Sequence, residues 1–87
     1  MKMIITIVKD SDADTLTQAF TSAEYRVTRV ASTGGFLRSG VATMLIGLED
    51  DQVEAAIALM KSKLGTGTGQ EPRLSLFVVP VERFIQV

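Results

Sequence analysis

The apolar positions along the chain follow strand spacing in four segments. Residues 3–8 form an almost continuous apolar and β-branched run, which predicts a central strand buried on both faces. Residues 25–31 alternate between two faces, with Arg26 and Thr28 on the same one. Residues 41–48 and 74–79 complete the set of four predicted strands, and Pro80 is expected to end the last one.

Two further segments repeat apolar residues at helical spacing. The first has its apolar face at Ala13, Leu16, Ala19, Phe20 and Ala23, and Ser11 or Asp12 is expected to cap it. The second has its stripe at Val53, Ala56, Ile57, Met60 and Leu64. It is expected to begin at Asp50 or Asp51, because Asp51 and Glu54 have the spacing of a capping box.

The predicted order is β-α-β-β-α-β in a single domain over residues 1–87. With right-handed crossovers this order gives a four-stranded antiparallel sheet with both helices on one face, an α+β fold. The other face of the sheet has no predicted cover. Together with an apolar tail at residues 81–87 that carries Phe84 and Ile85, the bare face predicts self-association into a closed ring such as a trimer.

Composition supports an oligomer and argues against several classes of partner. Hydrophobic residues make up 46% of the chain, which is more than a small monomer buries easily. No apolar run reaches the ~18 residues of a membrane span, and the first residues lack the pattern of a signal peptide, so we expect a cytoplasmic protein. A net charge of −1 provides no general attraction for nucleic acid.

The chain contains neither cysteine nor histidine. Disulfides, thiolate nucleophiles, the usual zinc and copper ligands and imidazole bases are therefore excluded. We expect a protein that is not an enzyme and that holds no metal and no cofactor. If it handled a metal, only carboxylates and methionines would be available as ligands.

Residues 31–40, Ala-Ser-Thr-Gly-Gly-Phe-Leu-Arg-Ser-Gly, form a connection longer than two antiparallel strands need. Gly34 and Gly35 let backbone N–H groups approach a ligand closely, and Phe36 offers a flat apolar face beside them. This combination suits a phosphate attached to a base. The alternative is a surface hairpin with an exposed phenylalanine. The loop is not a P-loop, since no lysine and no helix follow it.

Three arginines, Arg26, Arg29 and Arg38, lie near this loop in the sequence and could hold one or two phosphates through bidentate hydrogen bonds. The alternative is a solvated rim paired with Asp and Glu. Gly47 marks either a bulge or a close approach by another chain or a ligand. The Gly-Thr-Gly-Thr-Gly stretch after residue 64 is expected to be a linker that reaches Pro72, in preference to a phosphate nest.

Several motifs together resemble the PII-like cyclic di-AMP receptor family. They are the opening Met-Lys-Met-Ile-Ile-Thr-Ile-Val, Tyr25-Arg-Val-Thr, the run from Ser32 to Gly40, Ile46-Gly-Leu-Glu-Asp, and the closing segment from Phe77 to Gln86. They span nearly the whole chain. The resemblance implies a homotrimer of ferredoxin-like protomers that acts in signal transduction, binding a small nucleotide and contacting a downstream protein.

The same resemblance implies a ligand pocket between adjacent subunits. It would be formed by Arg26, Thr28, Gly35, Phe36, Leu37 and Gly47, with Phe77 and Gln86 arriving from the final strand and the tail. The chain departs from the family pattern at three places. At Val41 the family typically carries an asparagine that hydrogen-bonds adenine, and Glu24 stands where the family often has a neutral polar residue. The connection at residues 65–72 is also shorter than the corresponding loop of the family. Alternatives are therefore a PII-like trimer for another nucleotide or small anion, or a metal-handling trimer of similar shape.

Overall fold

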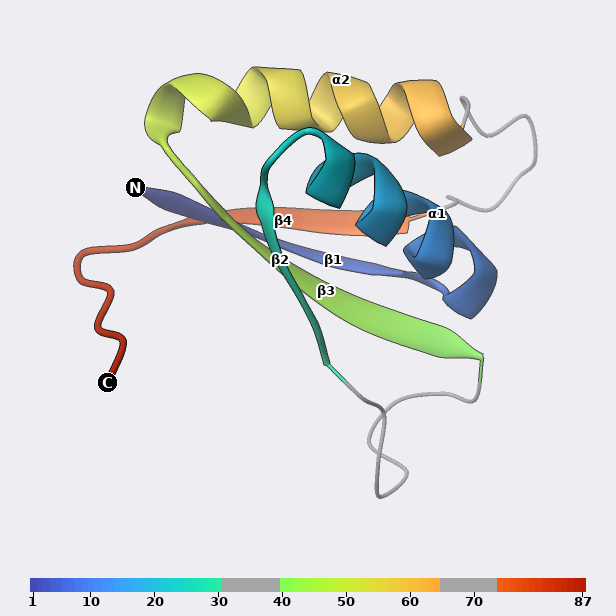
Figure 1. The fold of residues 1–87 in the computed structure, drawn as a ribbon, viewed down its shortest axis with the longest axis horizontal. Coiled ribbons are helices and arrows are strands. Elements are labelled where there is room, and N and C mark those ends of the chain that lie inside the picture. The colour runs from blue at the N-terminus through green and yellow to red at the C-terminus, as the bar shows by residue number, and fades with distance from the viewer. Residues whose placement is uncertain (31–39, 65–73) are drawn as a thin grey trace.

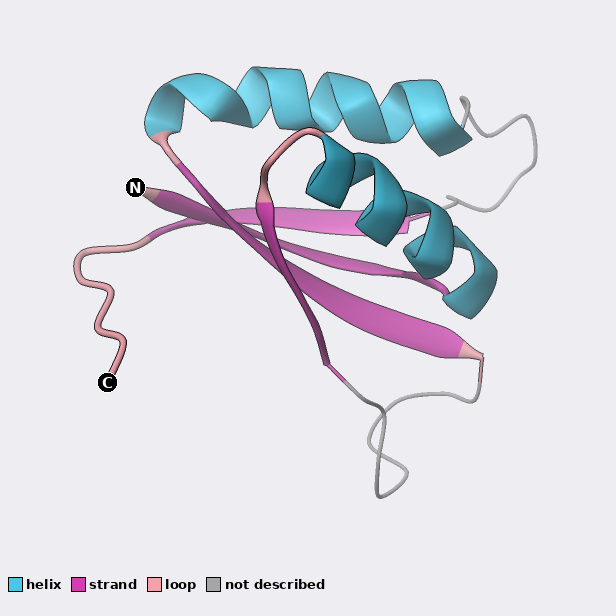
Figure 2. Cartoon of the chain, viewed as in Figure 1, coloured by secondary structure: helices cyan, strands magenta, loops and turns pink. Residues whose placement is uncertain are grey.

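Four antiparallel strands form one sheet, and two helices pack on one of its faces (Figures 1 and 2). The computed structural model describes residues 1–30, 40–64 and 74–87. The elements are β1 (Lys2–Lys9), α1 (Asp10–Ser22), β2 (Arg26–Val30), β3 (Val41–Leu48), a 3-10 turn (Asp50–Gln52), α2 (Val53–Leu64) and β4 (Leu74–Pro80). The predicted β-α-β-β-α-β order and the ferredoxin-like arrangement are confirmed.

The strands lie in the order β2-β3-β1-β4, so that β1 is central as predicted. Both neighbours of β1 are antiparallel to it: Ile5 is opposite Leu45 of β3 on one side and opposite Phe77 of β4 on the other. On the far side of β3, Thr28 of β2 is opposite Leu45. Residues opposite one another in such a ladder project from the same face of the sheet, so these pairings define which side chains share a surface.

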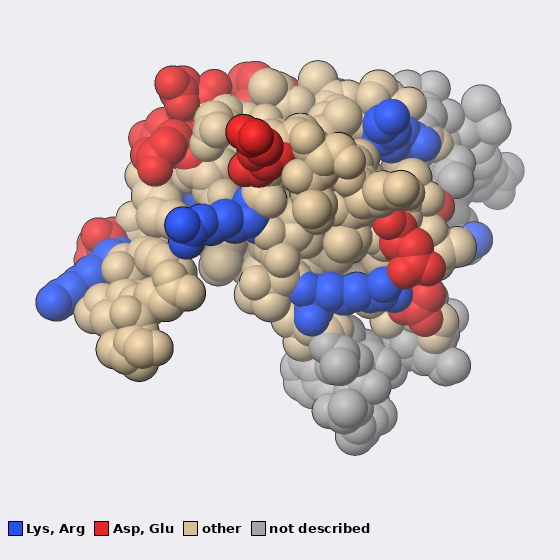
Figure 3. All heavy atoms as spheres, viewed as in Figure 1, with Lys and Arg blue, Asp and Glu red and all other residues tan. Residues whose placement is uncertain are grey.

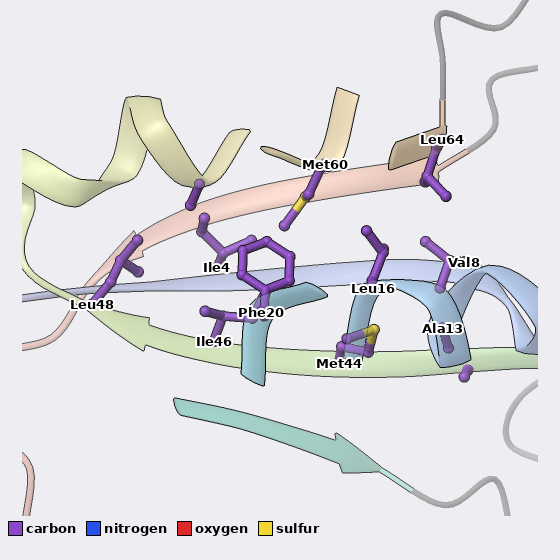
Figure 4. Close-up of a cluster of buried hydrophobic side chains, with 12 residues drawn as sticks. Ile4, Val8, Ala13, Leu16, Phe20, Met44, Ile46, Leu48, Met60 and Leu64 are labelled. Carbon is purple, nitrogen blue, oxygen red and sulfur yellow. The ribbon is translucent and has the colours of Figure 1, made fainter. Parts of the chain in front are cut away.

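The hydrophobic core lies between the sheet and the two helices (Figure 4). Its members alternate along β1 and β3. Along α1 and α2 they recur at helical spacing, as the sequence predicted. They are Ile4, Val8, Ala13, Leu16, Phe20, Ala42, Met44, Ile46, Leu48, Ala56, Met60 and Leu64. Tyr25, Val27, Val53 and Ile57 pack at the edge of this core.

Strand β1 is buried on one face in the protomer, whereas the sequence predicted burial on both. Ile4, Thr6 and Val8 point toward the helices and are buried, and the Thr6 hydroxyl donates a hydrogen bond to the Ser75 carbonyl at 2.9 Å. Residues Met3 and Ile5, on the other face, are only half-buried. Both helices lie on the first face, so nothing from this layer covers the second (Figure 1).

The starts of the helices differ from the predicted caps. Helix α1 begins at Asp10 without a side-chain cap, and the Asp10 N–H donates to the carbonyl of Gly40, far along the chain, at 2.8 Å. The capping box before α2 joins Glu49 and Gln52 in place of the predicted Asp51 and Glu54, and the Glu49 N–H donates to Gln52 Oε1 at 2.8 Å. Such bonds satisfy N–H groups at the helix N-terminus.

Helix α1 ends in a Schellman motif built around Glu24. The Tyr25 N–H donates to the Phe20 carbonyl and the Glu24 N–H donates to the Thr21 carbonyl, at 2.9 and 3.0 Å. The Phe20 and Tyr25 rings meet edge to face with centroids 5.2 Å apart. Glu24 takes a φ of 67°, a left-handed conformation that suits glycine far better than glutamate.

Substituting Glu24→Gly should therefore raise the free energy of unfolding by about 1 kcal/mol, the strain that a left-handed L-residue carries. Urea unfolding at matched protein concentration measures it. The control is Glu24→Ala, which removes the negative charge from the helix C-terminus but keeps a Cβ at positive φ, and should recover only a few tenths of a kcal/mol. Equal stabilisation by both variants would show that charge, and not backbone strain, is the penalty.

Candidate functional site

The face of the sheet opposite the helices is largely apolar. One row of side chains across it consists of Thr28, Leu45, Ile5 and Phe77, from β2, β3, β1 and β4. The next row consists of Arg26, Gly47, Met3 and Val79. Phe77 has 55% of its surface exposed, which is unusual for a phenylalanine in a strand. We call this surface the bare face.

Three of the predicted ligand residues come together at the β2 edge of the bare face. Arg26 and Gly47 are directly opposite one another on β2 and β3, and Thr28 follows two residues later on the same face as Arg26. Arg26 and Thr28 are both exposed. Within the described part of the chain, Arg26 makes no ion pair. The cluster thus offers a guanidinium and a hydroxyl beside a position without a side chain.

Gly47 is regularly paired on both sides, so the predicted bulge is absent. Met3 of β1 and Arg26 of β2 are its partners, and the register continues unbroken to Leu48. A Cβ placed on Gly47 would lie 3.7 Å from the ε-methyl group of Met1, which is an ordinary contact distance. Packing within the protomer therefore does not require glycine here, which leaves close approach by a ligand or another chain as the prediction.

Phe77 and Val41 lie on the same bare face but far from this cluster. Phe77 is on β4, and three strand spacings of about 4.8 Å separate β4 from β2, or about 14 Å. Val41 is at the opposite end of β3 from Gly47, and six residues of strand span about 20 Å. One protomer therefore cannot bring Arg26, Phe77 and Val41 around one small molecule.

Gln86 lies in the tail that follows β4. The tail leaves the sheet beside the N-terminus, where the Val81 N–H donates to the Met1 carbonyl at 3.0 Å, and then runs away from the body of the domain (Figure 1). Phe84 and Ile85 are 58% and 64% exposed. The tail thus carries apolar side chains that its own protomer does not bury.

Three predicted ligand residues, Gly35, Phe36 and Leu37, lie outside the described residues, as do Arg38 and the connection at residues 65–72. Their assigned roles stay predictions. The described ends of the first loop are Val30 of β2 and Gly40, which precedes β3. The loop therefore joins the same two strands that carry the cluster, but Arg26 and Gly47 lie at the opposite ends of these strands from the loop.

Arg29 pairs with acidic side chains, the alternative that the sequence offered for the three arginines. It lies on the opposite face of β2 from Arg26, and its guanidinium donates to the carboxylates of Asp14 and Asp10 on α1, at 2.5 and 3.3 Å. The hydrogen bond to Asp14, with a smaller contribution from Asp10, raises the pKa of Arg29 above its usual value. Arg29 ties β2 to α1 instead of holding phosphate.

A shallow groove of about 460 Å³ lies between α1 and α2, on the other side of the molecule from the bare face. It is lined mainly by small and polar side chains, among them Thr15, Gln18 and Ser22, with Leu59 and Lys63. The predicted ligand residues that the structure describes do not line it.

Figure 3 shows acidic side chains gathered over the beginning of α2, where Glu49, Asp50, Asp51 and Glu54 are all exposed.

The described residues contain neither a carboxylate cluster for a metal ion nor a membrane-spanning helix. No group of three or more acidic side chains in residues 1–30, 40–64 and 74–87 is placed to hold a metal ion. None of the described helices is long and apolar enough to cross a membrane.

Sequence reasoning missed one neighbour of the candidate site, Met1. Its ε-methyl group lies over Gly47. Strand alternation would place Met1 on the same face as Met3 and could have pointed to it, although the long reach of the side chain toward Gly47 is visible only in three dimensions.

Comparisons with known proteins agree with this fold. A crystal structure of a functionally unknown protein from Pediococcus pentosaceus ATCC 25745 is 31% identical in sequence, with a TM-score of 0.78 over 99% of this chain and 96% of that one. The family model described as cyclic-di-AMP receptor matches residues 1–71, which include Arg26, Thr28 and Gly47 but not Phe77 or Gln86. The chain belongs to the cyclic-di-AMP receptor family.

Proposed function

We propose that this protein is a non-enzymatic, PII-like signalling protein that binds cyclic di-AMP between adjacent subunits of a homotrimer. Membership of the cyclic-di-AMP receptor family supports the ligand. The single observation that supports an intersubunit site is the separation of the candidate residues. Arg26, Thr28 and Gly47 occupy one edge of the bare face, and Phe77 occupies the other.

A second protomer removes this separation. If the β4 edge of one subunit meets the β2 edge of the next, Phe77 of one chain faces the Arg26 cluster of another. The apolar surface supports such an assembly. Ile5, Leu45 and Phe77 form a continuous apolar row in which Ile5 and Leu45 are half-buried and Phe77 is exposed, and Phe84 and Ile85 are exposed in the tail. Exposed apolar patches of this kind mark association surfaces. A cyclic ring of three subunits would use each edge once.

The side chains in this arrangement match the chemistry of a cyclic dinucleotide, which carries two phosphates and two purine bases. The Arg26 guanidinium donates charge-assisted hydrogen bonds to a phosphate, and the Thr28 hydroxyl adds a second donor. The Phe77 ring stacks on a base for about 1–3 kcal/mol. Gln86 pairs with an adenine edge through its amide, which requires the tail of a chain to reach the pocket.

A second candidate is a PII-like trimer that binds another nucleotide or a small anion. The observation that favours it is Val41, a half-buried apolar side chain on the bare face that cannot hydrogen-bond a base edge. Loss of such a bond costs about 1–3 kcal/mol. No described residue favours the metal-handling alternative.

Isothermal titration of the purified protein with cyclic di-AMP, cyclic di-GMP, ATP and ADP tests the proposal. We expect saturable heat with cyclic di-AMP and weaker or no heat with the others. Tighter binding of a different nucleotide would favour the second candidate, and in that case Val41→Asn should shift the preference toward cyclic di-AMP. No heat with any of the four would overturn both.

Replacing Arg26 with alanine should weaken ligand binding by about 1.5–3 kcal/mol, because a hydrogen bond to a charged phosphate is lost. Folding should change little, since the side chain is exposed and makes no ion pair among the described residues. Lys61→Ala is the matched control: it removes an exposed positive charge from α2, on the helix side of the sheet. Equal losses in the two variants would indicate long-range charge and not a contact at Arg26.

Deleting residues 84–87 should lower ligand affinity more than it lowers stability. The deletion removes Gln86 together with Phe84 and Ile85, which make little contact within their own protomer, and it leaves the hydrogen bond between Val81 and Met1 in place. Sedimentation velocity and ligand titration on the shortened chain separate the two roles of the tail. A stable trimer with undiminished binding would remove Gln86 from the site.

A further inference from the structure

Gly47 leaves a gap in the second row of the bare face. Its strand partners there are Arg26 on β2 and Met3 on β1, and both carry long side chains. Above the glycine, within ordinary contact distance of where a Cβ would lie, is the ε-methyl group of Met1. The Met1 side chain therefore occupies the space beside Arg26 that a ligand must enter to approach the Gly47 backbone.

The backbone of Met1 is held at both of its polar groups. Its amino group is 3.1 Å from the Asp50 carboxylate, and its carbonyl accepts the hydrogen bond from the Val81 N–H at 3.0 Å. The amino group lowers the pKa of Asp50, chiefly through this hydrogen bond. The side chain is about one-third exposed and unbranched, so it can move while its backbone stays in place.

We propose that Met1 is a ligand-contacting residue of the nucleotide site, and that its thioether forms an adjustable apolar wall over Gly47 against which one base of the ligand packs. This inference rests on the proposed function and adds a residue to that site. Methionine suits the role because its sulfur is polarisable and makes favourable contacts with aromatic rings. Arg26, the direct strand partner of Gly47, would hold the phosphate attached to that base.

The proposal also links the pocket to the tail. The Met1 carbonyl accepts a hydrogen bond from the N–H of Val81, the first residue after β4, and the tail beyond Val81 carries Gln86. If a base of the ligand displaces the Met1 side chain, this movement takes place beside Val81, where the tail leaves the domain. Met1 would then sense the ligand at the same place where the tail of its own chain is anchored.

The test uses protein labelled with ¹³C at the methionine ε-methyl groups, of which the chain has four. Titration with cyclic di-AMP should shift the Met1 methyl resonance through the ring current of the purine, with the same dissociation constant as calorimetry. Met44 and Met60, buried in the core, serve as internal controls and should stay in place. The Arg26→Ala variant, at a ligand concentration too low to saturate it, should show a proportionally smaller shift.

A second measurement uses variants released from a cleavable fusion, so that residue 1 keeps its free amino group. Met1→Ala should weaken binding roughly two- to tenfold, the range of a sulfur–aromatic contact, and Met1→Leu should retain most of the affinity. Ligand binding without any shift of the Met1 methyl, or with full affinity in Met1→Ala, would overturn the role of Met1 alone. Absence of calorimetric binding by the natural chain would instead overturn the proposed function.

Discussion

Replacing Ile5 with aspartate should abolish both the proposed trimer and the proposed ligand binding. Ile5 lies at the centre of the bare face, between Leu45 and Phe77, and its side chain points away from the core. A carboxylate buried without a partner at a subunit interface costs several kcal/mol for each copy. Since the proposed pocket needs two chains, loss of assembly should reduce cyclic di-AMP affinity by more than a hundredfold.

Sedimentation velocity and titration calorimetry on Ile5→Asp measure the two effects, and far-UV circular dichroism checks that the protomer still folds. The control is Ala55→Asp, which adds the same charge on the exposed side of α2 and should leave assembly and binding unchanged. If Ile5→Asp unfolds, Leu45→Lys tests the same surface from β3. A folded Ile5→Asp protein that remains trimeric and binds normally would show that the bare face is not the interface.

Replacing Phe20 with alanine should remove about 3–5 kcal/mol from the free energy of unfolding, the usual cost of truncating a buried phenylalanine. The Phe20 side chain is fully buried between the helices and the sheet (Figure 4). Its ring also contacts that of Tyr25 edge to face. A domain of this size has a total stability of the order of 5–10 kcal/mol, so the variant should be close to unfolding at physiological temperature.

Urea unfolding monitored by circular dichroism measures this loss. Protein concentration must be equal for all variants, because subunit association contributes to apparent stability. The control is Thr21→Ala, which changes the next residue of α1 on its exposed side and should alter stability by less than about 0.5 kcal/mol. A loss below about 1 kcal/mol for Phe20→Ala would show that this ring is not the centre of the core.

Local patterns in the sequence were sufficient for the secondary structure. The apolar segment at residues 41–48 predicted β3 with its observed bounds, and the stripe from Val53 to Leu64 predicted α2 and the buried Ala56, Met60 and Leu64. Hydrophobic periodicity succeeds here because burial on one side of an element repeats with the geometry of the element itself. The shared face of Arg26 and Thr28 followed from the same period of two.

Features that depend on distant partners required the tertiary structure. The Asp10 N–H at the start of α1 donates to Gly40, thirty residues later in the chain, and no side-chain cap is formed at this end of the helix. Arg29 differs from Arg26 only in the face of β2 on which it lies, and α1 places two carboxylates on that face. Neither partner can be found from spacing along the chain.

For the candidate site, the sequence alone determined the residue types, and the resemblance of its motifs to a known family suggested their grouping. The strand order β2-β3-β1-β4, fixed only by the folded sheet, placed Arg26 beside Gly47 and put Phe77 across the full width of the sheet. That register also left Met1 over Gly47. The reason is physical. The alternation of residues along a strand determines which face each side chain takes, but strand pairing and register depend on hydrogen bonds between segments that are far apart in the sequence.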